Sequence, residues 1–290
     1  MTFQDTRAEL VHRRTYSRPI DEANNIFEDL SETTERIISH QRWLWSRALG
    51  RPLNEEQEQE LDDLYEIYYN LQASPSGRTR WLGGTEVAKT REASQFNCSF
   101  AEVDNVTDVV DLFWLLLQGC GVGFKPRPGI IRGFHQPVTV DVIRSTRTDK
   151  GGIEETTLSE GTKGHYYLVV GDSAEAWSRS IGKLLTIPSN ATHLTLDFSQ
   201  IRPAGERLSG YGWISSGDTA LADAYQKICN ILNQAVGRLL DDLEIMDLMN
   251  MLGATLSSRR SAEITLMDAD NDMIEEFMSA KKDHWVDRPW

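Results

Sequence analysis

Two segments of the sequence carry residue types suited to binding phosphate or a nucleotide. The first is the glycine-rich run Gly119-Cys-Gly-Val-Gly123. A dinucleotide-binding fingerprint needs a strand before its glycines and a helix after them, because the phosphate then meets the helix N-terminus. Here a helical pattern precedes the glycines and a strand pattern follows, so the Rossmann interpretation fails. The remaining interpretation is that the glycines let the backbone come close either to a ligand or to a packed neighbour.

The second segment is a long loop over residues 201–217, directly after a predicted strand. It contains the charged and flexible residues Arg202, Gly205, Arg207, Gly210 and Gly212, with aromatic residues among them. Loops at the carboxyl ends of strands form the ligand sites of open α/β sheets and barrels. Guanidinium groups suit phosphates, and a plain connector would be shorter. We therefore favour a ligand-binding loop and expect positive φ angles at Gly210 and Gly212.

The cysteines and histidines give weaker signals. Cys98, Cys120 and Cys229 are too few for a disulfide framework and contain no C-x-x-C pair. For Cys98, taken as an isolated cysteine between two phenylalanines, an inert core position is the favoured interpretation. We interpret Cys229 as structural and leave Cys120 open. The six histidines lack metal-ligand spacing, so no metal site is predicted.

Composition excludes several classes of protein. The 290 residues carry 44 acidic and 30 basic side chains, a net charge of −14, which argues against a surface built to hold DNA or anionic lipid. Hydrophobic residues make up 40%, enough for a core. No apolar stretch is long enough to span a membrane, and no secretory signal is visible. We expect a reduced, cytoplasmic, soluble protein.

The N-terminal region is helical by pattern. Within residues 20–72, Ser31-Glu-Thr-Thr-Glu35 supplies capping chemistry, and Asn54 predicts the N-cap of a second helix. Pro75 and Gly77 then end this region, so we place the boundary of a small helical domain near residue 78. The second helix carries an apolar stripe that is expected in the core, namely Leu61, Leu64, Tyr65, Tyr68, Tyr69 and Leu71.

Beyond residue 78, predicted helices and strands alternate, which favours an α/β fold with a largely parallel sheet. The segment Asp172-Ser-Ala-Glu175 predicts a helix start, and Asp149-Lys-Gly-Gly152 predicts a hairpin turn. Helices are predicted over 106–118, about 172–185, 219–240 and 242–256. Strands are predicted over 122–124, 138–142, 165–170, 194–199 and 261–267.

Five segments in a fixed order carry a family resemblance. They are Ala73-Ser-Pro-Ser-Gly-Arg78 with Trp81-Leu-Gly-Gly-Thr85, Asn97-Cys98, Gly119-Cys-Gly-Val-Gly-Phe124, Asp197-Phe-Ser-Gln-Ile-Arg-Pro203 and Arg259-Arg-Ser-Ala-Glu263. Together they resemble the adenosylcobalamin-dependent (class II) ribonucleotide reductases, of the monomeric ribonucleoside-triphosphate type. The resemblance runs from about Arg13 to the end of the sequence.

The resemblance implies a fold and a role for each segment of the chain. Residues 1–78 would form an N-terminal helical region. Residues 79–290 would form the first half of a ten-stranded α/β barrel. Within it, residues 125–193 would provide the effector site without a partner subunit. The loop 201–217 would relay the identity of a deoxynucleotide effector to the choice of base, through Arg202, Gly205, Arg207, Gly210 and Gly212.

The resemblance also implies a reaction. In this family a cysteine thiyl radical, initiated by adenosylcobalamin, replaces the ribose 2′-hydroxyl by hydrogen and so makes deoxyribonucleotides for DNA synthesis. A cysteine pair supplies the electrons and is reduced again by thioredoxin or a similar dithiol. Cys98 matches the first of that pair, which reverses the inert interpretation. Ser74 and Asn97 match substrate-holding positions, Ser74 at the phosphate end, and the Gly121 backbone would lie near the ribose.

One departure from the family pattern limits what the chain is expected to do alone. The radical cysteine lies in an Asn-Pro-Cys-Gly-Glu motif that this sequence does not contain. The second reducing cysteine and the C-terminal thiol pair are also missing. We expect an N-terminal portion, inactive alone and completed by a separate C-terminal half. The alternative is a catalytically inactive nucleotide-binding fragment or regulator. A neighbouring reading frame that encodes the missing motif would favour the first hypothesis.

Overall fold

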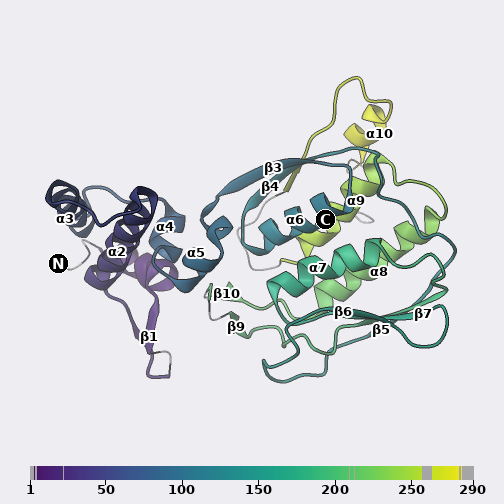
Figure 1. Ribbon diagram of the computed structural model, residues 1–290, viewed down its shortest axis with the longest axis horizontal. Helices are drawn as coiled ribbons and strands as arrows, with labels where there is room; N and C mark the ends of the chain where they lie inside the picture. Colours follow the sequence, from purple (N-terminus) through teal and green to yellow (C-terminus); the bar gives the residue numbers. More distant parts are fainter. Residues whose placement is uncertain are drawn as a thin grey trace. The chain divides into compact units, whose positions relative to one another are not determined.

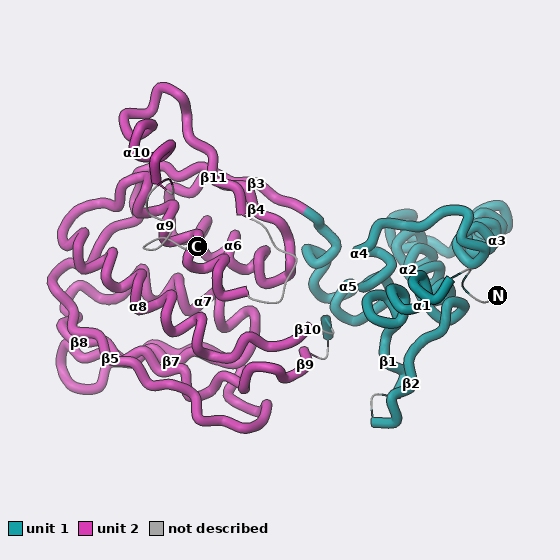
Figure 2. Tube along the Cα trace, turned by 180° about the vertical axis from the view of Figure 1, so that it is seen from behind, with its two compact units in different colours: residues 1–97, 209–212 teal, residues 98–208, 213–290 magenta. Residues whose placement is uncertain are grey.

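The computed structural model describes residues 3, 5–21, 23–208, 210–211, 213–256, 263–280 and 282. The chain divides into two compact units (Figure 2). Unit 1 comprises Met1–Asn97 together with Ser209–Gly212, and unit 2 comprises Cys98–Leu208 and Trp213–Trp290. The division follows Asn97, whereas the sequence places a boundary near residue 78.

The described part of unit 1 consists of helices and a short antiparallel hairpin, β1–β2 (Figure 1). The helices expected within residues 20–72 are present, and the hairpin precedes them. In chain order the elements are α1 (Thr6–Val11), the π-helix η1 (His12–Tyr16), β1 (Pro19–Asp21), β2 (Ile26–Phe27), α2 (Leu30–Leu49), α3 (Glu55–Tyr69), α4 (Gly77–Leu82), α5 (Glu86–Thr90) and the 3₁₀-helix η2 (Glu92–Gln95).

Reciprocal side-chain caps fix where the two long helices of unit 1 begin. Asn54 caps α3 as predicted, by exchanging hydrogen bonds with Gln57. In α2 the same box forms between Asp29 and Glu32, so the cap precedes the predicted Ser31 segment. The core stripe predicted for α3 is wrong beyond Leu61, the one member that is buried. Since α3 packs chiefly against α2, the aromatic residues remain partly exposed.

The described strands of unit 2 form a three-stranded sheet, a four-stranded sheet and a short hairpin. The first sheet is parallel, in the order β11-β4-β3, and consists of β3 (Cys98–Val103), β4 (Gly121–Pro126) and β11 (Glu263–Thr265). The second has the order β5-β8-β7-β6, with β6 antiparallel, and consists of β5 (Thr139–Ile143), β6 (Thr157–Glu160), β7 (His165–Val169) and β8 (His193–Asp197). The hairpin pairs β9 (Arg207–Leu208) with β10 (Trp213–Ile214).

Helices fill the space between the two larger sheets of unit 2 (Figure 1). Helix α6 (Val106–Leu117) and α9 (Asp242–Ala254) pack on the three-stranded sheet, while α7 (Ala174–Leu185) and α8 (Thr219–Gln234) pack on the other. Helix α6 also packs on α7, and α8 on α9, whereas α10 (Ile274–Ser279) comes last. The mixed α/β class is therefore confirmed. The strands form separate sheets, which do not by themselves make half of a ten-stranded barrel.

Three local predictions for unit 2 need correction. The turn at 149–152 does not make a hairpin, because β5 pairs in parallel with β8 and lies at the opposite edge of the sheet from β6. Ser173, rather than Asp172, caps α7, by accepting a hydrogen bond from the Ala176 amide at 3.0 Å. The helix predicted to reach residue 240 ends at Gln234, shortly before Gly237 adopts a positive φ of 76°.

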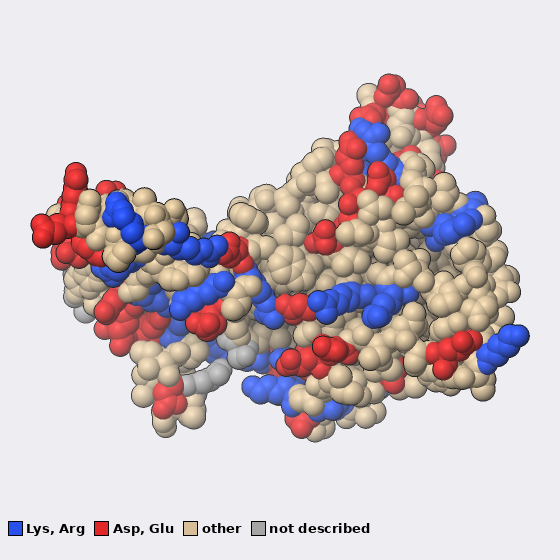
Figure 3. Space-filling view, viewed as in Figure 1, with Lys and Arg blue, Asp and Glu red and all other residues tan. Residues whose placement is uncertain are grey.

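The surface reflects the acidic composition. In unit 1 acidic side chains gather over α3, and in unit 2 they gather around α10 (Figure 3). Elsewhere on the face shown, acidic and basic side chains are interspersed. Among the described helices, none combines the length and the apolar character needed to cross a membrane.

Two buried histidines in unit 1 link its stability to pH. His12 and His40 are 3% and 4% exposed. Burial lowers the pKa of His12 below its usual 6.5, and the positive charge of Arg80 lowers it further. Burial likewise lowers the pKa of His40, with smaller effects from Lys89 and Arg36. Both rings are therefore neutral in the folded protein at pH values where an exposed histidine begins to protonate.

We predict that the free energy of unfolding falls as the pH drops below 6.5. Both histidines have lowered pKa values in the folded state, so below 6.5 the unfolded chain binds more protons and gains stability. Above 6.5 these two residues should contribute no pH dependence. Urea unfolding from neutral pH to about pH 5 measures the effect. The double variant H12Q/H40Q should show a flatter acid limb, and an unchanged slope would contradict the assignment.

A close helix contact in unit 2 gives a second stability prediction. A Cβ atom at Gly182 of α7 would lie 2.8 Å from Cγ2 of Val110 on α6, and the β-branched valine has little freedom to yield. Gly182→Ala should therefore cost about 1–2 kcal/mol of unfolding free energy, although alanine is normally favoured over glycine in a helix. In a V110A background the same change should be neutral or stabilising. A double-mutant cycle by chemical denaturation checks this, and additive effects would refute the contact.

Candidate functional site

The structure brings two of the predicted site residues together, Cys98 and Gly121. They are the first residues of the neighbouring parallel strands β3 and β4, and they are partners in the strand register. Cys98 is exposed, and Gly121 is partly exposed. The thiol of Cys98 therefore lies at the start of its strand, next to a position without a side chain.

The glycine-rich run is explained by the way α6 joins these strands. The capping amide of Asn105 starts α6, and Gly119 ends it with a φ of 78°, a conformation that favours glycine. The chain then returns as β4, parallel to β3. At Gly123 a Cβ atom would lie 3.0 Å from the ring of Phe100, so glycine leaves room for a packed neighbour. Of the two interpretations left open above, packing accounts for Gly123.

The sheet face that carries Cys98 is exposed and partly apolar in the described part of unit 2. In the strand register, Phe100 lies beside Gly123, and Gly123 lies beside Ile264. Phe100 is 55% exposed, Ile264 is 63% exposed and Leu266, just past β11, is 49% exposed. Parallel sheets are normally covered on both faces, and clustered exposed apolar residues mark a surface that meets another group.

The other two predicted substrate residues, Ser74 and Asn97, belong to unit 1. Ser74 lies in the segment before α4 and is exposed. Its hydroxyl accepts a hydrogen bond from Nη1 of Arg80 at 3.2 Å and donates one to the Pro75 carbonyl at 3.1 Å. Asn97 is the exposed last residue of the first segment of unit 1 and directly precedes Cys98. The side-chain partner of Ser74 is therefore Arg80, a residue of the same unit.

The predicted effector loop forms the hairpin β9–β10, and its arginines differ in setting. Arg202 is held by Asp172, since its Nε lies 3.0 and 2.9 Å from the two carboxylate oxygens and Nη2 reaches the Asp172 carbonyl at 3.2 Å. Asp172 is buried, so this pair fixes the start of the loop against the start of α7. Arg207 lies in β9, and Gly205 adopts a φ of 92° with open space around it.

Gly210, at the hairpin tip, differs from the prediction. Gly210 does not adopt a positive φ, and a Cβ there would lie 2.7 Å from Cγ2 of Val87 within unit 1. Arg18 holds this tip by donating to the Gly210 carbonyl at 2.6 Å and to the Tyr211 carbonyl at 3.2 Å. Glycine is required here by close packing rather than by backbone conformation. Gly212 lies outside the described residues.

The remaining cysteines are buried. Burial raises the pKa of Cys229 to about 12, so this side chain remains a thiol at neutral pH. Cys120 is fully buried and directly precedes β4. Within the described ranges no group of three or more histidine, cysteine or acidic side chains is arranged to hold a metal ion. Of the motif Arg259–Glu263, only Glu263 is described, and it begins β11 beside Val122.

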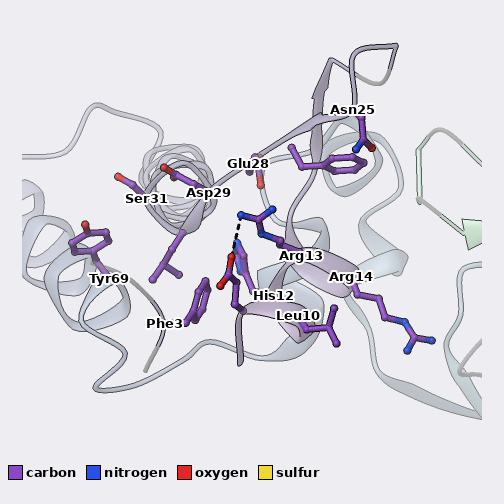
Figure 4. Close-up of a pocket in the computed structure, with 13 residues that line it drawn as sticks. Phe3, Leu10, His12, Arg13, Arg14, Asn25, Glu28, Asp29, Ser31 and Tyr69 are labelled. Carbon is purple, nitrogen blue, oxygen red and sulfur yellow. Dashed lines mark ion pairs between the residues drawn. The ribbon is translucent and has the colours of Figure 1, made fainter. Parts of the chain in front are cut away.

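Unit 1 also contains a cavity of about 650 Å³, lined by residues of α1, η1 and the start of α2 (Figure 4). Two ion pairs involve its charged groups, one of them with Arg36, which lies outside the lining. Arg13 pairs with Glu9 at 3.0 Å, and Glu28 pairs with Arg36 at 2.7 Å. Arg14 extends away from the Glu9–Arg13 pair (Figure 4). We assign no ligand to this cavity.

Sequence reasoning missed two residues, Asp172 and Arg80. Asp172 is interpreted from the sequence as a helix cap, but its carboxylate pairs with Arg202, which lies far along the chain. Arg80 is the second arginine of the segment Ser74-Pro-Ser-Gly-Arg-Thr-Arg80, and its spacing from Ser74 was the available signal. A spacing of this kind gains meaning only once helix α4, which begins at Gly77, brings Arg80 back to Ser74.

Known proteins match this chain over most of its length. The family model "Ribonucleotide reductase alpha domain" matches residues 1–85, and "B12-dependent ribonucleotide reductase, insertion domain" matches residues 142–232. Adenosylcobalamin-dependent ribonucleoside-triphosphate reductases of Lactobacillus helveticus and Lactobacillus acidophilus are both 29% identical, and that of Lactobacillus leichmannii is 26% identical. Each match covers 94% of this chain and 42% of the relative, so the chain spans less than half the length of these proteins.

A solved structure supports the same grouping at the level of the fold. The crystal structure of a B12-dependent (class II) ribonucleotide reductase superposes with a TM-score of 0.75 at 24% identity, and covers 95% of this chain and 43% of that one. The motif order, the two family models and the relatives agree with it. The family models, the relatives and the fold therefore agree that the chain is similar to the N-terminal portion of the B12-dependent, class II ribonucleotide reductases.

Proposed function

We propose that this chain is the substrate- and effector-binding portion of a ribonucleoside-triphosphate reductase that makes deoxyribonucleotides. The observation that carries the proposal is the register pairing of Cys98 with Gly121 on an exposed sheet face. A reducing thiol must reach a substrate, and an adjacent glycine leaves room for the ribose. The names of the relatives supply the substrate class and the cofactor, adenosylcobalamin.

Cys98 would act as one of two reducing thiols. When the ribose 2′-hydroxyl leaves as water and a hydrogen replaces it, two thiols lose one hydrogen atom each and become one disulfide. An exposed thiol suits this role, because it must meet the substrate, the second thiol and the reductant in turn. The second thiol would come from a further stretch of protein, and thioredoxin or a similar dithiol would then reduce the disulfide in the cytosol.

The substrate would be held through both polar side chains and bare backbone. Ser74 would contact a phosphate group with its hydroxyl, and Asn97 would contact the nucleoside with its amide. The Gly121 backbone would approach the ribose closely because no Cβ intervenes. Arg202 would fix the base of the effector loop through Asp172, while Arg207, in the hairpin β9–β10, would respond to the effector.

The exposed face beside Cys98 would be covered by the rest of the reductase. The row Phe100, Gly123 and Ile264 offers apolar surface on a parallel sheet, whose edge strands β3 and β11 could accept further strands. Completion of this sheet would turn residues 79–290 into the first half of a ten-stranded barrel. The covering protein would carry the Asn-Pro-Cys-Gly-Glu motif, either on the same chain or on a separate one.

Adenosylcobalamin would supply the radical that starts the reaction. Nothing in the lining of the unit 1 cavity identifies a corrinoid as its ligand. We therefore assign none of the described residues to holding the cofactor and derive no step through it. The chemistry assigned to this chain is confined to binding the nucleotides and to the Cys98 thiol.

We predict that the chain alone makes no deoxynucleotide, whereas the chain completed with the motif-bearing portion does, given adenosylcobalamin and a dithiol. In the completed enzyme Cys98→Ser should abolish multiple turnover, because a serine hydroxyl cannot form the disulfide. Cys229→Ala is the matched control and should retain turnover, since Cys229 is buried in the core. Product analysis by chromatography measures both. Full turnover by C98S, or turnover by the isolated chain, would overturn the assignment.

We predict that Arg207→Ala in the completed enzyme flattens the effector-dependent preference among substrates. A typical allosteric coupling of about 1–3 kcal/mol corresponds to a change of roughly 5- to 150-fold in substrate preference. Lys227→Ala removes one positive charge from the exposed side of α8 and serves as the control. Competition among the four ribonucleotides, with and without each deoxynucleotide, gives the preference ratios. If R207A leaves the substrate preference ratios unchanged, the proposed role of the loop is wrong and the loop is a passive connector.

A further inference from the structure

Arg80 occupies an unusual position for an arginine in unit 1. Its Nη1 donates a hydrogen bond to the Ser74 hydroxyl at 3.2 Å, and its guanidinium carbon lies 5.3 Å from the centroid of the Tyr16 ring. The side chain is only partly exposed. A guanidinium over an aromatic face is attracted to the ring and restrained by it. Arg80 is therefore directed toward the exposed Ser74 side chain.

Among the described residues, no carboxylate balances the charge of Arg80. None of the ion pairs found among the described residues includes Arg80, and burial lowers the pKa of its guanidinium. Two other arginines in unit 1 differ, since Arg36 pairs with Glu28 and Arg47 pairs with Glu92. Partial burial of a cation without a counter-ion is unfavourable, so an anion that reaches Arg80 gains from the interaction.

The surroundings hold Arg80 in place before any ligand arrives. Nη2 of Arg36 donates to the carbonyls of Tyr16 and Arg80, at 3.3 and 3.2 Å. Arg36 is itself fixed by its partly buried ion pair with Glu28 at 2.7 Å. The backbone of η1, which carries the ring, and that of α4, which carries the guanidinium, are thus tied to one arginine. A restrained guanidinium loses little further freedom when it binds.

We propose that Arg80 is a phosphate-binding residue of the substrate site and acts together with Ser74. The planar guanidinium presents paired N–H donors that match phosphate oxygens, and the Ser74 hydroxyl adds a donor next to them. The identification of the ligand as a nucleotide phosphate rests on the proposed function. The affinity of Arg80 for an anion rests only on its contacts and charge.

The full chain and inorganic tripolyphosphate provide the first test. Isothermal titration at low ionic strength should give saturable binding to the wild-type chain. Arg80→Gln should weaken it roughly tenfold or more, and Arg80→Lys should recover part of the loss by restoring the charge without the planar fork. Arg47→Gln is the matched control, because Arg47 also lies over an aromatic ring, 5.0 Å from that of Trp43, but has a carboxylate partner.

Several outcomes of this titration would overturn the proposal. They are the absence of saturable binding to the wild type, equal binding by R80Q and the wild type, and an equal loss in R47Q. If Arg80 only ties α4 to η1, R80Q would lower the melting temperature but leave tripolyphosphate affinity unchanged. Melting curves of R80Q and R80K, recorded with and without tripolyphosphate, separate these two roles.

The completed enzyme distinguishes this inference from the proposed function. In it, R80Q should raise the KM for a ribonucleoside triphosphate by roughly tenfold or more, with a smaller change in kcat, because the phosphate is remote from the ribose. Turnover with an unchanged KM in R80Q would refute the role of Arg80 and leave the reductase assignment intact. Absence of turnover, with tripolyphosphate binding that depends on Arg80, would refute the reductase assignment and support the anion site.

Discussion

The packing of α6 is the interaction on which the rest of unit 2 depends. One side of this helix, with Val109, Phe113 and Leu116 fully buried, covers the parallel strands β3 and β4. The helix also packs on α7, which in turn lies on the four-stranded sheet. Because α6 is the connection between β3 and β4, its packing fixes the register that places Cys98 beside Gly121. A shift of α6 would therefore disturb both the core and the candidate site.

The two faces of the three-stranded sheet have opposite character, and this asymmetry links the fold to the proposed chemistry. The face toward α6 and α9 is buried, with Val122 and Phe124 of β4 almost fully covered. The opposite face carries Cys98 and Phe100, both exposed. A thiol that works on a substrate needs access, whereas the apolar residues near it need cover. A cleft completed by further protein would satisfy both requirements, as the proposed reductase does.

Arginines of this chain illustrate how environment, rather than residue type, decides a role. Arg202 lies in the loop where the sequence predicts an anion-binding function, yet a buried carboxylate, Asp172, already occupies its guanidinium. No sequence pattern predicted a role for Arg80, yet it is partly buried beside the Ser74 hydroxyl and the Tyr16 ring. A guanidinium that already has a carboxylate partner gains less from binding a phosphate. The tertiary environment therefore makes Arg80 a better candidate for anion binding than Arg202.

The sequence by itself determined the family resemblance, most helices and strands, and the Asn54 cap, because these depend on motif order, periodicity and residues three or four apart. It failed at the α3 stripe and at the turn near residue 150, since burial and strand pairing depend on partners distant in sequence. Only the tertiary structure aligned Cys98 with Gly121, bound Arg202 to Asp172 and, among the described residues, placed no carboxylate against Arg80. Each of these contacts is set by packing between elements, which local sequence does not encode.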